Sequence, residues 1–75
     1  STAYTNESLL GQVGKVIVPI PSNGYGEITI ETVNGLIAKR ATGLDNEEIE
    51  YEKQVLIIEV KDGTFLVKEY VPFIK

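Results

Sequence analysis

The stretch EITIETVNGLIAKRA, residues 27–41, carries the clearest strand and turn signals of this 75-residue chain. Its first half alternates polar and apolar residues, which is the pattern of a strand with one buried and one solvated face. The pair Asn34-Gly35 follows and is a strong hairpin signal, because a type I′ turn needs positive φ at both central residues. We therefore predict that residues 35–41 fold back antiparallel to residues 27–33.

Three further stretches are rich in β-branched and aromatic residues and are predicted to be strands: residues 12–20, 54–60 and 64–70. The first carries apolar residues on both faces, which predicts a strand covered on both sides over part of its length. Gly14 inside it predicts a bend or a bulge. Pro19 lacks an N–H group, so the end of this strand should lie at a sheet edge.

The connections between these strands differ in kind. Lys61, Asp62 and Gly63 are typical of a tight turn between the last two strands. The acidic segment at residues 42–53 breaks the strand pattern, and either an irregular loop or one or two turns of helix fits it. Its carboxylates lack the spacing and the Gly of an EF-hand loop, so we interpret them as a solvated face. Electrostatic docking on a basic partner is the alternative for this segment.

The whole pattern predicts an all-β fold, a five-stranded OB-fold-like Greek-key barrel. A flat sheet of so few residues would leave one face exposed to water. Apolar residues on both faces of the first and fourth predicted strands, residues 12–20 and 54–60, instead favour a sheet that curls into a barrel. An SH3-like barrel, which also uses five short strands, is the alternative. We assign residues 1–8 to a linker or disordered N-terminus and residues 9–75 to a single barrel domain.

Composition argues against several classes of function. The chain has no Cys and no His, so it has neither a thiolate site nor a His base to activate a nucleophile. A net charge of -4 argues against nucleic acid and anionic membrane surfaces as partners. We therefore expect no enzymatic activity, no cofactor and no bound metal. The chain does not begin with Met, so we expect it to be a fragment of a longer protein or a processed product. Any upstream segment, such as a membrane anchor, would then lie outside this chain.

A tyrosine flanked by glycines lies just before this hairpin, in PSNGYGE, residues 21–27. In one interpretation the glycines supply positive φ in a hairpin and Tyr25 covers the mouth of the barrel. In the other, the loop presents Tyr25 to a partner, since an exposed Tyr offers a large contact area at low entropic cost. We take Tyr25, Asn23 and Glu27 as candidate protein-contact residues, with Phe73 of the apolar C-terminal tail as a fourth.

Much of the chain resembles a known family. LLGQVGKVIVPIPSNGYGEI, residues 9–28, followed by GLIAKRATG, residues 35–43, is similar to the C-terminal soluble domain of NfeD-family membrane proteins. VLIIEVKDGTFLVKEY, residues 55–70, resembles the closing hairpin of that domain. The similarity is especially close to the short bacterial branch of the family whose members are flotillin partners, the YuaF-like branch.

The resemblance implies an OB-fold barrel that normally follows transmembrane helices. It also implies partnership with SPFH-type membrane proteins, such as flotillins and stomatins, in the organisation of membrane microdomains. The function that follows is a non-catalytic protein-interaction module. Such a domain is soluble and cytoplasmic, and it is held at the cell membrane only through a segment outside this chain.

An oligonucleotide-binding OB domain is the alternative function, because OB barrels often stack bases on aromatic residues. Here Lys15, Lys39 and Arg40, together with Tyr25, would have to supply the binding platform. The nearby Glu27 and Glu31 oppose phosphate, so we favour the protein-interaction module.

Overall fold

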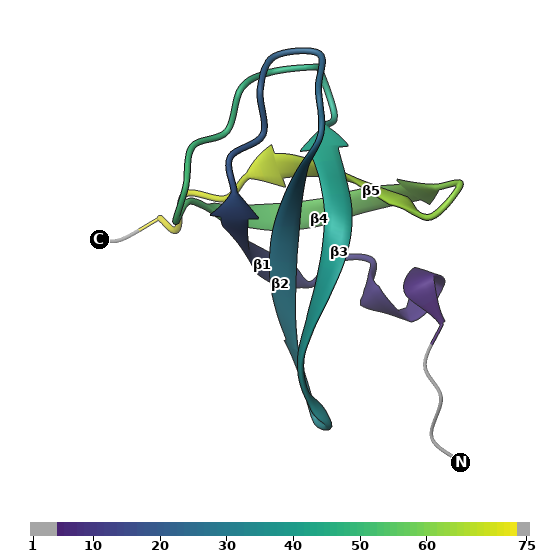
Figure 1. The fold of residues 1–75 in the computed structure, drawn as a ribbon. Helices are drawn as coiled ribbons and strands as arrows, with labels where there is room; N and C mark the ends of the chain where they lie inside the picture. Colours follow the sequence, from purple (N-terminus) through teal and green to yellow (C-terminus); the bar gives the residue numbers. More distant parts are fainter. Residues whose placement is uncertain (1–4, 74–75) are drawn as a thin grey trace.

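The computed structural model describes residues 5–73, and their strands form a closed barrel. The elements are η1 (Asn6–Leu9), a 3-10 helix, and the strands β1 (Val13–Val18), β2 (Gly26–Thr32), β3 (Gly35–Gly43), β4 (Gln54–Lys61) and β5 (Thr64–Glu69). The strand order is β1-β2-β3-β5-β4, and β4 pairs with β1 to close the barrel. Figure 1 shows the β2–β3 hairpin crossing the β4–β5 hairpin. With β3 and β5 parallel and the other pairs antiparallel, the barrel is OB-like, and the fold prediction is confirmed.

The β2–β3 hairpin forms as the alternating pattern predicts, with the two isoleucines of β2 buried. Its turn differs from the prediction. Thr32 pairs with Gly35, so Val33 and Asn34 are the central residues, and neither has a positive φ. Gly35 follows them with a φ of 109°. The two central residues of the turn therefore have negative φ, so the turn is not of type I′, and the positive φ falls on the glycine that follows it.

The β4–β5 turn has the geometry that was expected at the other hairpin. Lys61 pairs with Thr64, so Asp62 and Gly63 occupy the two central positions. Their φ values of 52° and 78° are both positive, as a type I′ turn requires. This turn brings the end of β4 and the start of β5 next to the outer face of β3, where the candidate site lies.

The first strand contains a bulge, but Gly14 does not make it. The pairing of β1 with β2 shifts between Val16 and Val18, and β1 ends before Pro19. Gly14 serves a different purpose, because a Cβ there would lie 2.8 Å from the carbonyl oxygen of Thr29 on β2. The glycine thus allows β1 and β2 to approach closely.

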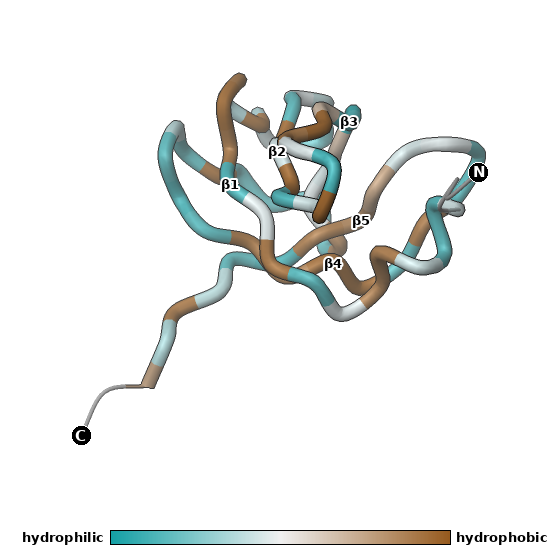
Figure 2. The backbone as a smooth tube through the Cα atoms, turned by 90° about the horizontal axis from the view of Figure 1, so that it is seen from below, coloured by the Kyte–Doolittle hydropathy of each residue, from teal (hydrophilic) through white to brown (hydrophobic). Residues whose placement is uncertain are grey.

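Only the inner face of the barrel wall is fully buried. Val13, Ile17 and Val18 of β1 each leave more than a third of their surface exposed, so the prediction of a strand covered on both faces is wrong. The physical reason is that alternate residues of a barrel strand point outward. A second shift of register, between Ile57 and Glu59, interrupts the alternation in β4. Figure 2 shows largely hydrophobic stretches along β4 and β5.

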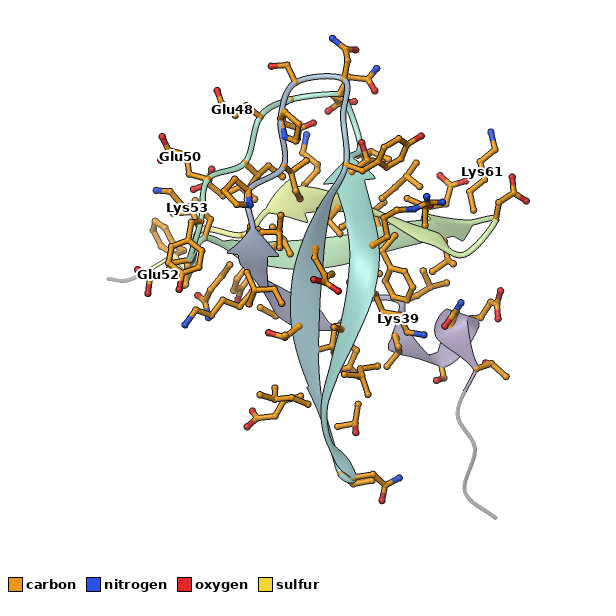
Figure 3. The ribbon with its side chains drawn as sticks, viewed as in Figure 1. Lys39, Glu48, Glu50, Glu52, Lys53 and Lys61 are labelled. Atoms are coloured by element: carbon orange, nitrogen blue, oxygen red, sulfur yellow. The ribbon has the colours of Figure 1, made fainter. Side chains whose placement is uncertain are left out.

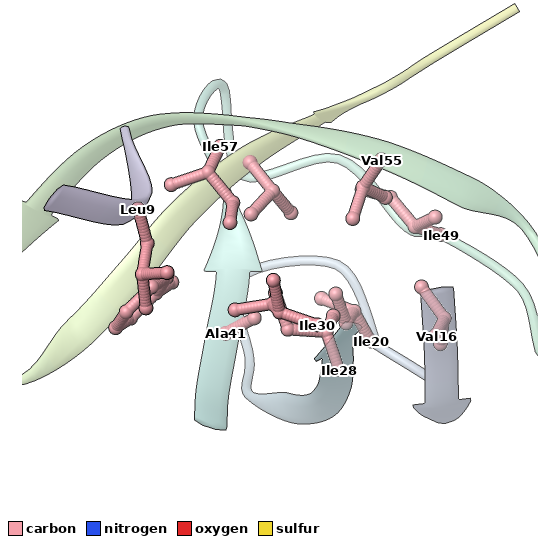
Figure 4. Packing of buried hydrophobic residues seen from close by; sticks show 11 residues of the cluster. Leu9, Val16, Ile20, Ile28, Ile30, Ala41, Ile49, Val55 and Ile57 are labelled. Carbon is pink, nitrogen blue, oxygen red and sulfur yellow. The ribbon is translucent and has the colours of Figure 1, made fainter. Parts of the chain in front are cut away.

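The core is one cluster of buried apolar side chains (Figure 4). Its members are Leu9, Val16, Ile20, Ile28, Ile30, Ala41, Ile49, Val55, Ile57, Phe65 and Val67. Ile20 and Ile49 lie outside the strands and pair through two backbone hydrogen bonds of 2.9 and 2.8 Å. Residues 44–53 are therefore an irregular loop that is anchored in the core at Ile49, which decides between the two structures that the sequence allows.

The N-terminal segment contributes to this core through η1, whose last residue Leu9 is buried. Residues 1–4 of the predicted linker lie outside the described residues, and the division of the chain at residue 9 stays a prediction. In residues 5–73, no helix has the length and apolar character needed to cross a membrane.

Candidate interaction site

The glycines on either side of Tyr25 are required by close packing. A Cβ on Gly26 would collide with carbonyl oxygens at and just after the end of β1, and a Cβ on Gly24 would lie 2.5 Å from Cγ of Pro21. Neither glycine has a positive φ, so the prediction that they supply that conformation is wrong. Asn23 supplies it instead, with a φ of 56°. The ring of Pro21 therefore fills the space at Gly24, and backbone carbonyl groups fill it at Gly26.

Tyr25 itself is 60% exposed and faces a residue of β3. The Cζ atom of Arg40 lies 5.0 Å from the centroid of the tyrosine ring, which is a cation–π contact. The loop that carries the ring is fastened to β3, since the hydroxyl of Thr42 donates to the carbonyl oxygen of Gly24 at 2.7 Å. The stacked pair is thus held at the surface by fixed backbone.

A second contact fixes the guanidinium of Arg40. Its Nε–H donates to the hydroxyl oxygen of Thr64, a buried residue at the start of β5, at 3.0 Å. The parallel pairing of β3 with β5 places Ala41 opposite Phe65, which brings Arg40 beside Thr64. Among residues 5–73, neither of the two ion pairs involves Arg40. Its two Nη groups therefore have no protein partner in the described part of the chain.

Glu27 lies opposite Arg40 in the β2–β3 register, on the same outer face. Opposite charges at such cross-strand positions usually attract one another. Here the described residues contain no Glu27–Arg40 ion pair, because the guanidinium is turned toward Tyr25 and Thr64. Glu27 is thus a nearby carboxylate that does not neutralise the arginine by direct contact.

Two shallow depressions meet at the Tyr25–Arg40 pair, each with a volume of about 370 Å³. The first is also lined by Thr42, Lys61, Asp62, Thr64 and Leu66. The second is also lined by Val18, Gly26 and Glu27. OB barrels commonly bind ligands on the face of strands 2–3 and at the loops that join strands 1–2 and 4–5. The site that we call the Arg40 site, formed by Tyr25, Arg40 and Thr64, occupies that region.

The four predicted contact residues are not all brought together. Tyr25 and Glu27 line the same depression. Asn23 is in the loop before them, and its N–H donates to the carbonyl oxygen of Asn46 at 3.0 Å. Phe73 is 84% exposed on a tail that leaves the barrel on the side opposite to the β4–β5 turn (Figure 1). A partner contact through any of the four stays a prediction.

Charge is distributed unevenly around the barrel. Glu48, Glu50 and Glu52 lie on one side together with Lys53, and Lys39 and Lys61 lie on the other (Figure 3). The loop between β3 and β4 is fastened to β5 by an ion pair between Asp45 and Lys68, at 2.9 Å. This hydrogen bond and the charge of Asp45 raise the pKa of Lys68 above its ordinary value of 10.5. The Arg40 site thus lies on the less acidic side of the molecule, next to Lys61.

The basic residues that the sequence suggested as a nucleic-acid platform do not converge on one site. Lys15 lines a separate depression of about 400 Å³ with Val13, Ile17 and Leu36. Lys39 lies on the opposite face of β3 from Arg40, because successive residues of a strand alternate between faces. Sequence reasoning missed Thr64, since nothing in the sequence pairs it with an arginine 24 residues away.

The arrangement is suited to binding charged groups. Within residues 5–73, no three acidic side chains are placed to hold a metal ion. The site offers a positioned guanidinium, an aromatic face and a lysine, which can recognise an anion and an apolar surface together. Its residues provide no acid–base pair next to a nucleophile.

Comparisons with known proteins agree with this architecture. The protein-family model of the NfeD C-terminal domain matches residues 13–68 of this chain. The chain is 39% identical over 72 residues to the membrane protein NfeD2 of Bacillus subtilis (strain 168). That match covers 96% of this chain and 41% of NfeD2, so the chain spans about two fifths of the length of this relative.

Solved structures show the same barrel. The soluble domain of the NfeD protein YuaF from Bacillus subtilis superimposes with a TM-score of 0.78 at 38% identity, over 88% of this chain and 79% of that one. The C-terminal domain of stomatin operon partner protein 1510-C from Pyrococcus horikoshii has a TM-score of 0.75 at 20% identity, over 93% and 100%. The first match confirms the resemblance seen in the sequence. The second match, at 20% identity, shows that the fold is shared.

Proposed function

Because this chain belongs to the NfeD C-terminal domain family, we propose that it is the protein-interaction domain of a membrane-anchored NfeD-type protein. In this proposal its partner is a flotillin- or stomatin-like membrane protein of the SPFH type, and its role is non-catalytic. The full-length protein resides in the cell membrane and helps to organise microdomains there. The barrel faces the cytoplasm.

The observation that carries the proposal is the family match over residues 13–68, which includes the barrel almost entirely. The relative with 39% identity is described as a membrane protein, which supports a membrane anchor elsewhere in the full-length protein. The name of the Pyrococcus horikoshii protein, a stomatin operon partner, supports the choice of an SPFH-type partner. The absence of Cys and His from the sequence supports a binding role over catalysis.

Oligonucleotide binding is the second candidate, because the Arg40 site occupies the region that OB barrels use for nucleic acids. Two observations weigh against it. Glu27 and Asp62 border the two depressions, and the chain carries a net charge of -4. Fluorescence anisotropy with labelled single strands at low salt tests this candidate. Saturable binding would support it, and a flat trace up to high protein concentration would dismiss it.

In-membrane cross-linking tests the main proposal. This chain contains no Cys, so in a full-length protein whose other cysteines have been replaced, a Ser22→Cys change places a single thiol in the loop before Tyr25. Val33→Cys, in the exposed β2–β3 turn, is the matched control. Each variant of the full-length protein is co-expressed with an SPFH-type protein and treated with a bifunctional thiol–amine reagent. We expect a covalent complex from Ser22→Cys and much less from Val33→Cys, whereas no complex from either position would contradict the proposal.

A further inference from the structure

We propose that the Arg40 site is a receptor for a carboxylate and that its ligand is an acidic segment of the partner protein. This inference rests on the proposed function, because it specifies what the interaction domain recognises. The observation behind it is that Arg40 is held in place but not neutralised. Two contacts hold its side chain, and no carboxylate of the described residues pairs with it.

The contacts of Arg40 leave one edge of the guanidinium available. Nε is occupied by the hydroxyl of Thr64, so a ligand must bind end-on, through Nη1 and Nη2. A carboxylate accepts two parallel hydrogen bonds from such a fork, and the charges strengthen both. The Tyr25 ring, with its centroid 5.0 Å from Cζ, restricts the plane of the fork. Holding the arginine in advance lowers the entropic cost of binding.

The surroundings favour a single acidic segment over a polyanion. One carboxylate needs one fork, and Lys61 at the edge of the same depression can attract a second acidic residue. A nucleic acid would bring a row of phosphates past Glu27 and Asp62, which repel them. The exposed ring of Tyr25 offers apolar contact area to the side chains between the acidic residues of a peptide.

The acidic loop of the same molecule does not occupy the site. Glu48, Glu50 and Glu52 lie on the side of the barrel away from Lys61 (Figure 3). Asp45 is engaged with Lys68. The neighbouring carboxylate is Glu27, which faces Arg40 across the strands without pairing with it. Glu27 therefore weakens a carboxylate ligand by repulsion, and removing its charge should strengthen binding.

The direct test is an NMR titration of the ¹⁵N-labelled 75-residue chain with hexaglutamate, with hexaglutamine as the neutral control. The Nε–Hε signal of Arg40 reports on the fork itself, and the amides of Tyr25 and Thr64 report on its two supports. We expect saturable shifts at these signals with hexaglutamate and none with hexaglutamine. Absence of shifts at millimolar hexaglutamate, or equal shifts with both peptides, would overturn the proposal.

Variants separate the fork from general electrostatics. Arg40→Gln and Lys15→Gln make the same change in net charge. Lys15, however, lines the separate depression of Val13, Ile17 and Leu36, outside the Arg40 site. We expect Arg40→Gln to weaken hexaglutamate binding at least about tenfold and Lys15→Gln to have little effect. Arg40→Lys keeps the charge without the fork and should weaken binding almost as much, while Glu27→Gln should strengthen it. Equal losses in Arg40→Gln and Lys15→Gln, or full affinity in Arg40→Lys, would contradict a specific carboxylate site.

Other occupants give distinct results. Tighter binding of a single-stranded oligonucleotide than of hexaglutamate would overturn the proposal in favour of nucleic acid. Concentration-dependent self-association that Arg40→Gln abolishes would overturn it in favour of a second copy of this chain. Cross-linking from Ser22→Cys to the SPFH-type protein with no hexaglutamate binding would refute only the carboxylate site. Hexaglutamate binding without that cross-link would refute only the proposed partner.

Discussion

The Cζ atom of Arg40 lies 5.0 Å from the ring centroid of Tyr25, and the Nε–H of the same side chain donates to Thr64. These contacts join the β1–β2 loop, β3 and the start of β5 at the surface of the barrel. They also explain why a tyrosine stands between two glycines. The ring of Pro21 excludes a side chain at Gly24, and backbone carbonyl groups exclude one at Gly26. Tyr25 extends outward against the arginine.

Tyr25→Ala should leave the barrel nearly as stable as before. The ring is 60% exposed, and an exposed cation–π contact contributes about 0.5–1 kcal/mol. The guanidinium of Arg40 should become more mobile, because one of its two contacts is lost. Urea unfolding measures the first effect, and the heteronuclear NOE of Arg40 Nε measures the second. Tyr25→Phe, which keeps the ring, is the control, and a loss of several kcal/mol in Tyr25→Ala would instead show that the ring is structural.

Gly26→Ala should destabilise the fold by about 1–3 kcal/mol, because overpacking forces the backbone to move. The new Cβ would collide with carbonyl oxygens at the end of β1.

Gly35→Val tests a different cause, since no atom lies within 4 Å of its Cβ position but its φ is 109°. Backbone strain there should cost about 1–3 kcal/mol. Unchanged thermal midpoints would show that the close approach at Gly26, or the turn at Gly35, is wrongly placed.

Ile49→Ala should cost about 2–5 kcal/mol, as for a residue in the middle of a strand. Ile49 is only 1% exposed, although it lies in the irregular loop between β3 and β4. Ile28→Ala in β2 provides the matched comparison, because Ile28 belongs to the same cluster. Urea unfolding of both variants measures the two losses. A loss below about 0.5 kcal/mol in Ile49→Ala alone, as at ordinary surface positions, would mean that the loop is not part of the core.

Asp45→Asn should lower the pKa of Lys68 toward its ordinary value of 10.5, because the hydrogen bond and the charge of Asp45 raise it. A raised pKa in the folded state means that the pair stabilises the fold below pH 10.5 and that this contribution is lost as the pH rises through the folded pKa. The pair is exposed, so added salt should weaken the effect. An NMR titration of Lys68 measures the pKa, with Glu48→Gln as the variant of equal charge. An unchanged Lys68 pKa in Asp45→Asn would contradict the pair.

Local patterns in the sequence were enough to predict the hairpins and the OB-like barrel. The alternation in residues 27–33 and the turn residues after it are signals between neighbours in the chain. The bulges at Ile17 and Ile58 were not predictable in this way, because apolar residues on both faces hide which one is the extra residue. The burial of Ile49 depends on its pairing with Ile20, which is not a local signal.

The candidate site was predictable only in part. Tyr25 and Glu27 stand out because they follow a glycine-rich turn, and the structure places both beside Arg40. The hydrogen bond from Arg40 to Thr64 depends on the parallel pairing of β3 with β5, which closes the barrel between segments far apart in sequence. No periodicity in either strand indicates that contact.

We propose that the face around Tyr25 and Arg40 contacts an SPFH-type membrane protein. The most direct measurement is an amide-resolved NMR titration of this domain with the purified cytoplasmic part of such a protein. We expect shifts at Tyr25 and Arg40 and along residues 61–64, and we expect Arg40→Gln to abolish them. Shifts confined to the depression around Ile17 and Leu36, or no shifts at high concentration, would contradict it.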